Sequence, residues 1–206
     1  MKTKILATML FITMWGVESC TKDTASGYNS QLPPETQVGA NTFGVTINGK
    51  VYKPRDPTGN GIYPSSKGMT FVGSSSNNWN EIVVKDGASA VGFKMIIHFK
   101  QLVYNYNGLY PLSNSNFQDQ SDSLPIDHIY FKIWDSAISN YAYYGSMENL
   151  GAIDVTRFNG STSINWILSG TFYGKFVRYD NPNDFITITD GRFDLNLNTL
   201  PNTVFP

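Results

Sequence analysis

Cysteine is nearly absent from this sequence of 206 residues, which contains only Cys20. A single thiol cannot form a disulfide within the chain, a redox pair or a thiolate metal site. Histidine is almost as rare: His98 and His128 are the only two, and they do not have the spacing typical of zinc sites. The sequence therefore predicts no metal centre and no cofactor.

Basic runs and long apolar runs are also missing. Lys and Arg total 15 against 16 Asp and Glu, without a basic cluster, so a nucleic-acid partner is not expected. Beyond the N-terminus, no stretch approaches the roughly 20 apolar residues of a membrane-spanning helix. Charged residues make up only 15% of the chain and aromatic residues 14%, a balance that favours strands over helices.

The N-terminus has the pattern of an export signal. Lys2 and Lys4 precede an apolar run, residues 5–16, that is too short to span a bilayer. The following Val-Glu-Ser-Cys resembles a bacterial lipobox, which implies that residues 1–19 are removed and that Cys20 is acylated. The alternative is an ordinary secretory signal, but it would leave an unexplained reactive thiol in an oxidising compartment. Several acyl chains on Cys20 would make the membrane a permanent partner.

The mature chain divides into a tether and one domain. Residues 20–40 have little apolar periodicity, and Pro33-Pro34 favours extended backbone, so they are predicted to form a flexible tether. Residues 41–206 are a suitable length for a single domain. Loss of residues 1–19 changes the net charge from −1 to −2. The sequence does not indicate an oligomeric state.

Apolar residues alternate with polar ones along several segments, a period of two that is typical of strands. The clearest segments are 92–100, 127–135, 153–156 and 163–173. Residues 54–73, rich in proline and glycine, predict an irregular connection, and no long segment has helical periodicity. We therefore expect an all-β, antiparallel domain, either a β-sandwich or a closed or partly open meander barrel.

Two dipeptides that end in glycine predict local backbone features. Asn48-Gly49 favours a type I′ hairpin turn. Around Asp190-Gly191 the apolar residues change phase, which predicts a β-bulge with Gly191 in the left-handed conformation. One extra residue there would place both apolar sets on the same face: Ile186, Ile188, Phe193, Leu195 and Leu197.

Two groups of motifs resemble a family of Bacteroidetes lipoproteins of unknown function. The first is Leu-Pro-Pro-Glu-Thr-Gln-Val-Gly-Ala-Asn-Thr-Phe-Gly at 32–44 with Ile-Asn-Gly-Lys at 47–50. The second is Ser-Gly-Thr-Phe at 169–172 with Ile-Thr-Asp-Gly-Arg-Phe-Asp at 188–194. The resemblance implies an all-β protein of the cell envelope, without catalytic residues to transfer. Val45 stands where the family often has cysteine.

The resemblance also bears on location and on one charged cluster. Lys22-Asp23 is similar to signals that send such lipoproteins to the outer surface, so we expect an outer-membrane lipoprotein, facing the cell surface rather than the periplasm. Within the closing motif, Arg192 is expected to pair with a flanking carboxylate, Asp190 or Asp194, and to brace the last strand. The alternative for this cluster is a polar contact site.

The sequence contains no motif typical of a catalytic centre. Both histidines fall on the polar face of predicted strands and are expected to lie at the surface, and no nucleophile elbow occurs. Pairs of aspartates could still serve a hydrolase, because glycosidases need only two suitably spaced carboxylates. Oxygen ligands for calcium could come from Asp119, Asp122 and Asp127 or from 180–184, although neither group follows an EF-hand pattern.

Aromatic residues provide the strongest indication of binding. Flat rings beside amides suit sugar rings, and aromatic anchors also serve protein interfaces. The residues selected on this basis are Tyr104, Tyr106, Trp134, Tyr141, Tyr143 and Tyr144. Alternatively, these rings only cover the sheet. The sequence thus predicts a non-enzymatic module for a glycan, a peptide or a partner protein, with a hydrolase and an accessory subunit of an envelope complex as alternatives.

Overall fold

The computed structural model describes residues 31–58, 67–73, 79–118, 126–159 and 165–206. In this part of the chain the regular structure is almost entirely β. The elements are β1 (Thr42–Ile47), β2 (Lys50–Tyr52), β3 (Met69–Gly73), β4 (Asn80–Lys85), β5 (Lys94–Phe99), β6 (Gly108–Pro111), β7 (His128–Asp135), β8 (Asn140–Asn159), β9 (Ile167–Arg178), β10 (Asn181–Asn196) and a short 3₁₀ turn, η1 (Leu200–Asn202).

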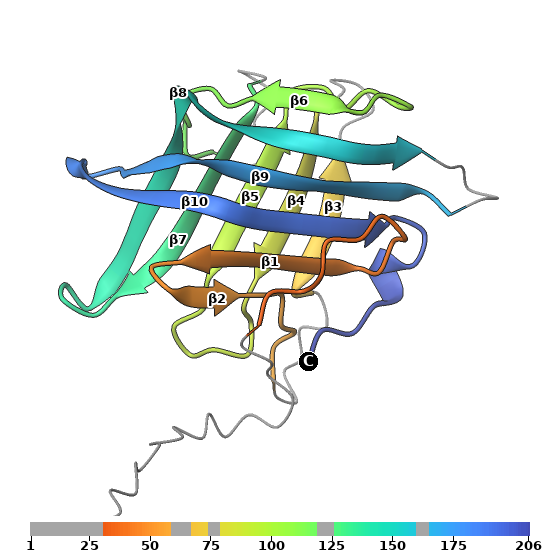
Figure 1. The fold of residues 1–206 in the computed structure, drawn as a ribbon. Coiled ribbons are helices and arrows are strands. Elements are labelled where there is room, and N and C mark those ends of the chain that lie inside the picture. The colour runs from red at the N-terminus through yellow and green to blue at the C-terminus, as the bar shows by residue number, and fades with distance from the viewer. Residues whose placement is uncertain (1–30, 59–66, 74–78, 119–125, 160–164) are drawn as a thin grey trace, which may run out of the picture.

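The strands form one antiparallel sheet of ten strands in the order β2-β1-β10-β9-β8-β7-β5-β4-β3, with β6 paired to β8. The sheet curls into a half-barrel. In Figure 1, β1, β2, β9 and β10 run crosswise in front of β3, β4, β5 and β7. The prediction of an all-β, antiparallel domain is confirmed. Its two facing layers belong to one continuous sheet, because β8 takes part in both.

The long strand β8 bends where it passes from one layer to the other (Figure 1). Its register against β9 shifts between Ser146 and Gly151, and Asn149 adopts a positive φ of 59°. At this corner Gly151 lies so close to Gly174 that an added Cβ would stand 2.6 Å from the Gly174 Cα atom. Strands commonly change layers at such irregularities. The corner allows the sheet to enclose a core.

The core fills the concave side of the sheet. Residues predicted to share a face in β5 and β7, such as Met95, Ile97 and Phe131, are fully buried there. Leu200 and Phe205 of the C-terminal segment, whose turn η1 contacts the edge strand β3, complete the core. The backbone N–H of Asp56 donates to the Phe205 carbonyl oxygen at 3.0 Å and holds that segment in place.

Residues 54–73 contain a strand that the sequence analysis did not predict. It is β3, which pairs with β4 along Met69–Gly73 and forms one edge of the sheet. Its short apolar run lies among glycines, so local composition concealed it. Residues 59–66 of the same stretch lie outside the described part of the chain.

The Asn48-Gly49 turn is confirmed. Both residues have positive φ angles, 50° and 76°, as a type I′ turn requires, and Ile47 pairs with Lys50 across it. The β-bulge in β10 is also confirmed, because its register against β9 shifts by one residue between Ile188 and Gly191.

The predicted left-handed conformation of Gly191 is wrong. The only described glycines with positive φ are Gly39 and Gly49. Glycine is needed at 191 for another reason: an added Cβ would stand 2.3–2.5 Å from ring atoms of Phe172, which is fully buried. The close approach of this ring, rather than the backbone angle, requires the missing side chain.

We expect Gly191→Ala to lower the free energy of unfolding by about 1–3 kcal/mol, the usual cost of overpacking a core. Urea denaturation measures the change. In a Phe172→Leu background the same substitution should cost less, because the smaller side chain leaves room for the methyl group. Equal costs in both backgrounds would mean that the contact with Phe172 is not responsible.

Candidate functional site

Three of the predicted aromatic residues lie together on the outer face of the β7–β8 hairpin. Trp134 pairs directly with Tyr141, and Lys132 pairs with Tyr143. The Trp134 and Tyr141 rings meet edge to face with centroids 5.5 Å apart, and Lys132 Nζ lies 4.3 Å from the Tyr141 ring centre. Trp134 is 39% exposed and Tyr143 is 43% exposed. The hairpin therefore presents flat rings to solvent.

Tyr179, which the sequence analysis did not select, extends this group. It follows the last residue of β9, and its backbone N–H donates to the Tyr143 carbonyl oxygen at 2.9 Å. Its side chain is 72% exposed, and the Phe117 ring packs edge-on against it at 5.0 Å. The register of β8 against β9 places Tyr179 beside Tyr143, and no local pattern indicates that. We call Trp134, Tyr141, Tyr143 and Tyr179 the aromatic stripe.

The remaining predicted aromatic residues lie elsewhere. Tyr144 points to the inner face, is only 5% exposed and donates its hydroxyl to Asp184, so its assignment to a surface site is corrected. Tyr104 and Tyr106 are exposed near the opposite end of β8, where Tyr104 packs edge-on against Phe158. The structure therefore divides the predicted binding residues into two groups, the aromatic stripe and a second group in which the Tyr104 ring also meets the Trp166 ring at 6.3 Å.

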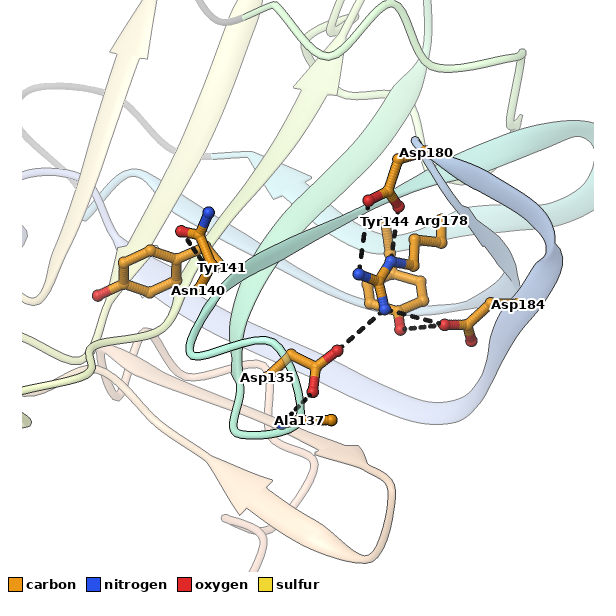
Figure 2. A network of polar contacts seen from close by, with 8 residues as sticks. All are labelled: Asp135, Ala137, Asn140, Tyr141, Tyr144, Arg178, Asp180 and Asp184. Carbon is orange, nitrogen blue, oxygen red and sulfur yellow. Dashed lines mark hydrogen bonds and ion pairs between the residues drawn. The ribbon is translucent and has the colours of Figure 1, made fainter.

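Beneath the aromatic stripe, one arginine gathers three carboxylates on the inner side of the sheet. Arg178 donates from Nε to Asp180 at 2.6 Å and from Nη1 to Asp135 and Asp184 at 3.0 and 3.3 Å. Figure 2 shows Tyr141 on one side of the hairpin and Tyr144 on the other, with its hydroxyl beside Asp184. The network ties the β7–β8 hairpin to the β9–β10 hairpin and so supports the stripe from below.

The carboxylates of this network are engaged by Arg178. Its hydrogen bond holds the pKa of Asp180 below the usual value, and the bonds to Asp180, Asp135 and Asp184 outweigh burial and raise the pKa of Arg178. Asp180 and Asp184, considered above as calcium ligands, therefore neutralise an arginine. Of the other candidates, Asp119 and Asp122 lie outside the described residues, and Asp127 accepts a hydrogen bond from the Lys100 N–H at 2.9 Å.

The expectation that both histidines lie at the surface is wrong, because His98 and His128 are each only 1% exposed. Residues 113–118 cover the outer face at this point, and Ser115 Oγ lies 3.0 Å from His128 Nδ1. His98 Nδ1 donates to the Ile126 carbonyl oxygen at 2.7 Å, and its Nε2 lies 4.0 Å from Glu81 Oε1. A pattern of alternation cannot show that a loop covers the polar face of a strand.

Burial decides the charge of both imidazoles. It lowers the pKa of His98, and together with the nearby His98 it lowers the pKa of His128 to about 3. Both rings are therefore neutral near pH 7. A buried base with so low a pKa is poorly matched to proton transfer at neutral pH.

The opening and closing motifs meet at Asp194. Residues 31–40, here called the strap, lie across the outer face of the sheet instead of forming a free tether up to residue 40 as expected. The Asp194 carboxylate, 1% exposed, accepts hydrogen bonds from five donors. These are the hydroxyls of Thr36 (2.5 Å) and Ser169 (2.6 Å) and the backbone N–H groups of Val38 (3.1 Å), Gly39 (2.8 Å) and Ala40 (3.1 Å).

These hydrogen bonds decide the charge state of Asp194. Burial alone would raise its pKa, but the bonds from Ser169, Thr36 and the strap amides outweigh it and hold the pKa below the usual value. The carboxylate is thus an ionised anchor for the strap. The fit is also steric, because an added Cβ on Gly44 would stand 2.4 Å from Pro33 Cδ.

Arg192 contacts the strap as well. Its Nη1 donates to the Pro33 carbonyl oxygen at 3.2 Å, and its Nη2 lies 3.6 Å from Glu35 Oε1. The predicted pairing with a flanking carboxylate is therefore corrected: the carboxylate partner is Glu35, and Asp190 contributes its backbone carbonyl oxygen at 3.1 Å. The Asp190 carboxylate accepts from the Thr46 N–H instead.

Among the described residues, no three His, Cys, Asp or Glu side chains are arranged to hold a metal ion. The same part of the chain contains no helix that is long and apolar enough to cross a bilayer. No protein-family model, curated protein or solved structure matches the sequence. Any proposal for the function therefore has to be argued from the geometry of the chain itself.

Proposed function

We propose that this protein is a lipid-anchored component of the bacterial cell envelope whose β domain binds a glycan through the aromatic stripe. The observation that carries the proposal is the exposure of Trp134 on β7, Tyr143 on β8 and Tyr179 in the turn after β9, three neighbouring segments of the sheet. Sugar rings stack their apolar C–H faces on such side chains, and Lys132 at the margin can donate to sugar hydroxyls. No catalytic step is included in this proposal.

The support beneath the stripe favours a preformed binding surface. Arg178 ties the two hairpins that carry Trp134 and Tyr179, so little order has to be gained on binding. The nearby carboxylates are held by the same arginine on the opposite side of the sheet. This arrangement favours binding over the alternative of a carboxylate-dependent hydrolase.

We expect Tyr143→Ala to weaken glycan binding about thirtyfold, since removing an aromatic anchor costs about 2 kcal/mol. A glycan array identifies a ligand, and isothermal titration measures the affinity. The matched control is Tyr173→Ala on the outer face of β9, because Tyr173 is 46% exposed and lies outside the stripe. The proposal would be contradicted if the protein bound no glycan on the array, or if both variants lost the same amount of affinity.

The membrane anchor requires a separate test. Metabolic labelling with a palmitate analogue should mark the native chain and should be lost in Cys20→Ser, because acylation needs the thiol. Protease accessibility on intact cells should then show the domain at the cell surface. Label that persists in Cys20→Ser would contradict the lipoprotein assignment without affecting the proposed glycan site.

A further inference from the structure

A cavity lies between the strap and the sheet, far along β9 from the aromatic stripe. Its volume is about 210 Å³. The strap contributes residues 34–37, and the strands below contribute Thr42 from β1, Thr156 from β8, Thr171 from β9 and Arg192 from β10. Thr42 pairs with Asp194, and Thr171 pairs with Arg192. Because Arg192 and Asp194 are two residues apart on β10, the side chains of both pairs lie on the same outer face. The strap and the sheet form the two walls of this space, which is open to solvent on one side.

The cavity presents both hydrogen-bond donors and acceptors. Arg192 is held in place by its bonds to Pro33 and Asp190, which leaves Nη2 facing the Glu35 carboxylate at 3.6 Å, longer than a direct hydrogen bond. The hydroxyls of Thr42 and Thr171 can each donate and accept. A guanidinium, a carboxylate and hydroxyls around one space suit a ligand that carries several hydroxyl groups.

The charges around the cavity favour a neutral ligand. Arg192 contributes one positive charge, whereas Glu35 and Asp194 contribute two negative charges. Asp194 already accepts five hydrogen bonds, so its lone pairs are occupied by the strap and Ser169. These lining side chains together carry a net negative charge, which would repel an anion. A neutral hydroxylated molecule would use the remaining groups without that cost.

The volume limits the size of the ligand. The cavity of about 210 Å³ is smaller than the roughly 300–1,000 Å³ of pockets for drug-sized ligands, so it suits a small molecule such as one sugar ring. We infer that the cavity binds a single neutral sugar residue or a polyol of that size. The inference is independent of glycan binding at the aromatic stripe, because it depends on different residues.

The strap is part of this site. Glu35 and Gln37 come from the strap, and the remaining groups come from the sheet. The Asp194 anchor, which docks the strap, therefore also assembles the cavity. A ligand that contacts both sides would in turn hold the strap on the sheet.

The test uses the full mature chain in a detergent without a sugar headgroup, titrated separately with D-glucose, D-galactose, D-mannose and N-acetyl-D-glucosamine. We expect saturable amide shifts in the NMR spectrum at residues 35–37, 42 and 171 for at least one sugar. Thr171→Val should weaken that binding about tenfold, the effect of losing one hydrogen bond. Glu35→Ala should weaken it at least as much, whereas Thr187→Val on an exposed part of β10 should leave it unchanged.

Each result bears directly on the inference. Shifts at 134, 141, 143 and 179 alone would support the aromatic stripe and overturn the cavity site. Absence of saturable shifts with all four sugars, or an unchanged affinity in Thr171→Val, would also overturn it. D-glucuronate should bind more weakly than D-glucose, and tighter binding of the anion would refute a neutral ligand. Unchanged spectra elsewhere in Thr171→Val show that the fold is retained.

Discussion

Replacement of Asp194 by alanine is expected to detach the strap and to lower the free energy of unfolding by about 3–5 kcal/mol. The carboxylate is buried and accepts five hydrogen bonds, so its loss leaves three backbone N–H groups and two hydroxyls without their acceptor. Each buried donor left unsatisfied costs about 1–3 kcal/mol, and release of the strap to water relieves part of that cost. Urea denaturation measures the difference.

Hydrogen exchange distinguishes release of the strap from general destabilisation. In Asp194→Ala the amides of Val38, Gly39 and Ala40 should exchange rapidly, whereas amides in β5 and β7 should stay protected under native conditions. Asp194→Asn keeps the shape but introduces an NH₂ group opposite N–H donors, so it should also lose stability. The exposed Glu148→Ala serves as the control and should change stability by less than about 0.5 kcal/mol. Protected strap amides in Asp194→Ala would contradict this account.

Stability is expected to fall as the pH drops from 7 to 5, chiefly because of the buried histidines. In the unfolded chain His128 takes up a proton below pH 6.5, but in the folded chain its pKa is about 3. The unfolded state therefore binds more protons across this range, and the free energy of unfolding decreases with falling pH. At pH 5 the His128 contribution is about 2 kcal/mol, and the lowered pKa of His98 acts in the same direction.

Neighbouring groups act in other pH windows or in the opposite direction. Burial raises the pKa of Asp127, so the folded state binds its proton more readily and gains stability as the pH falls toward 4. The lowered pKa of Asp194 matters only below about pH 4, where its stabilisation is lost. Denaturation between pH 7 and 5 in wild type and in His128→Asn therefore isolates the histidine, and the variant should show a shallower slope. Equal slopes would mean that His128 takes up its proton as readily in the folded state as in the unfolded state.

Much of the fold could be predicted from local patterns. Alternation identified the buried face of β5 and β7, Asn48-Gly49 identified its turn, and the phase change in β10 identified the bulge. Each of these depends on neighbours in the chain. The conformation of Gly191 was predicted wrongly because the reason for that glycine is the Phe172 ring of another strand. The strand β3 was missed because its pairing with β4, rather than its own composition, establishes it.

The candidate sites depended more on the tertiary structure. Trp134, Tyr141 and Tyr143 could be selected because one hairpin carries them, whereas Tyr179 joins them only through the β8–β9 register. The cavity beneath the strap could not be predicted, because Glu35 and Thr171 are far apart in the sequence. The resemblance drew attention to the opening and closing motifs. It could not show that they bind one another.

By itself the sequence determined the all-β class, the hairpin turn, the bulge and the alternating buried faces, because these follow from the period of the side chains and from local backbone preferences. The tertiary structure alone decided which polar residues are buried, where the strap docks and which rings share a surface. His98 and Asp194 are ordinary polar residues in an alternating pattern. Only a loop or a strap from elsewhere in the chain, laid across the outer face of the sheet, removes them from water and assigns their roles.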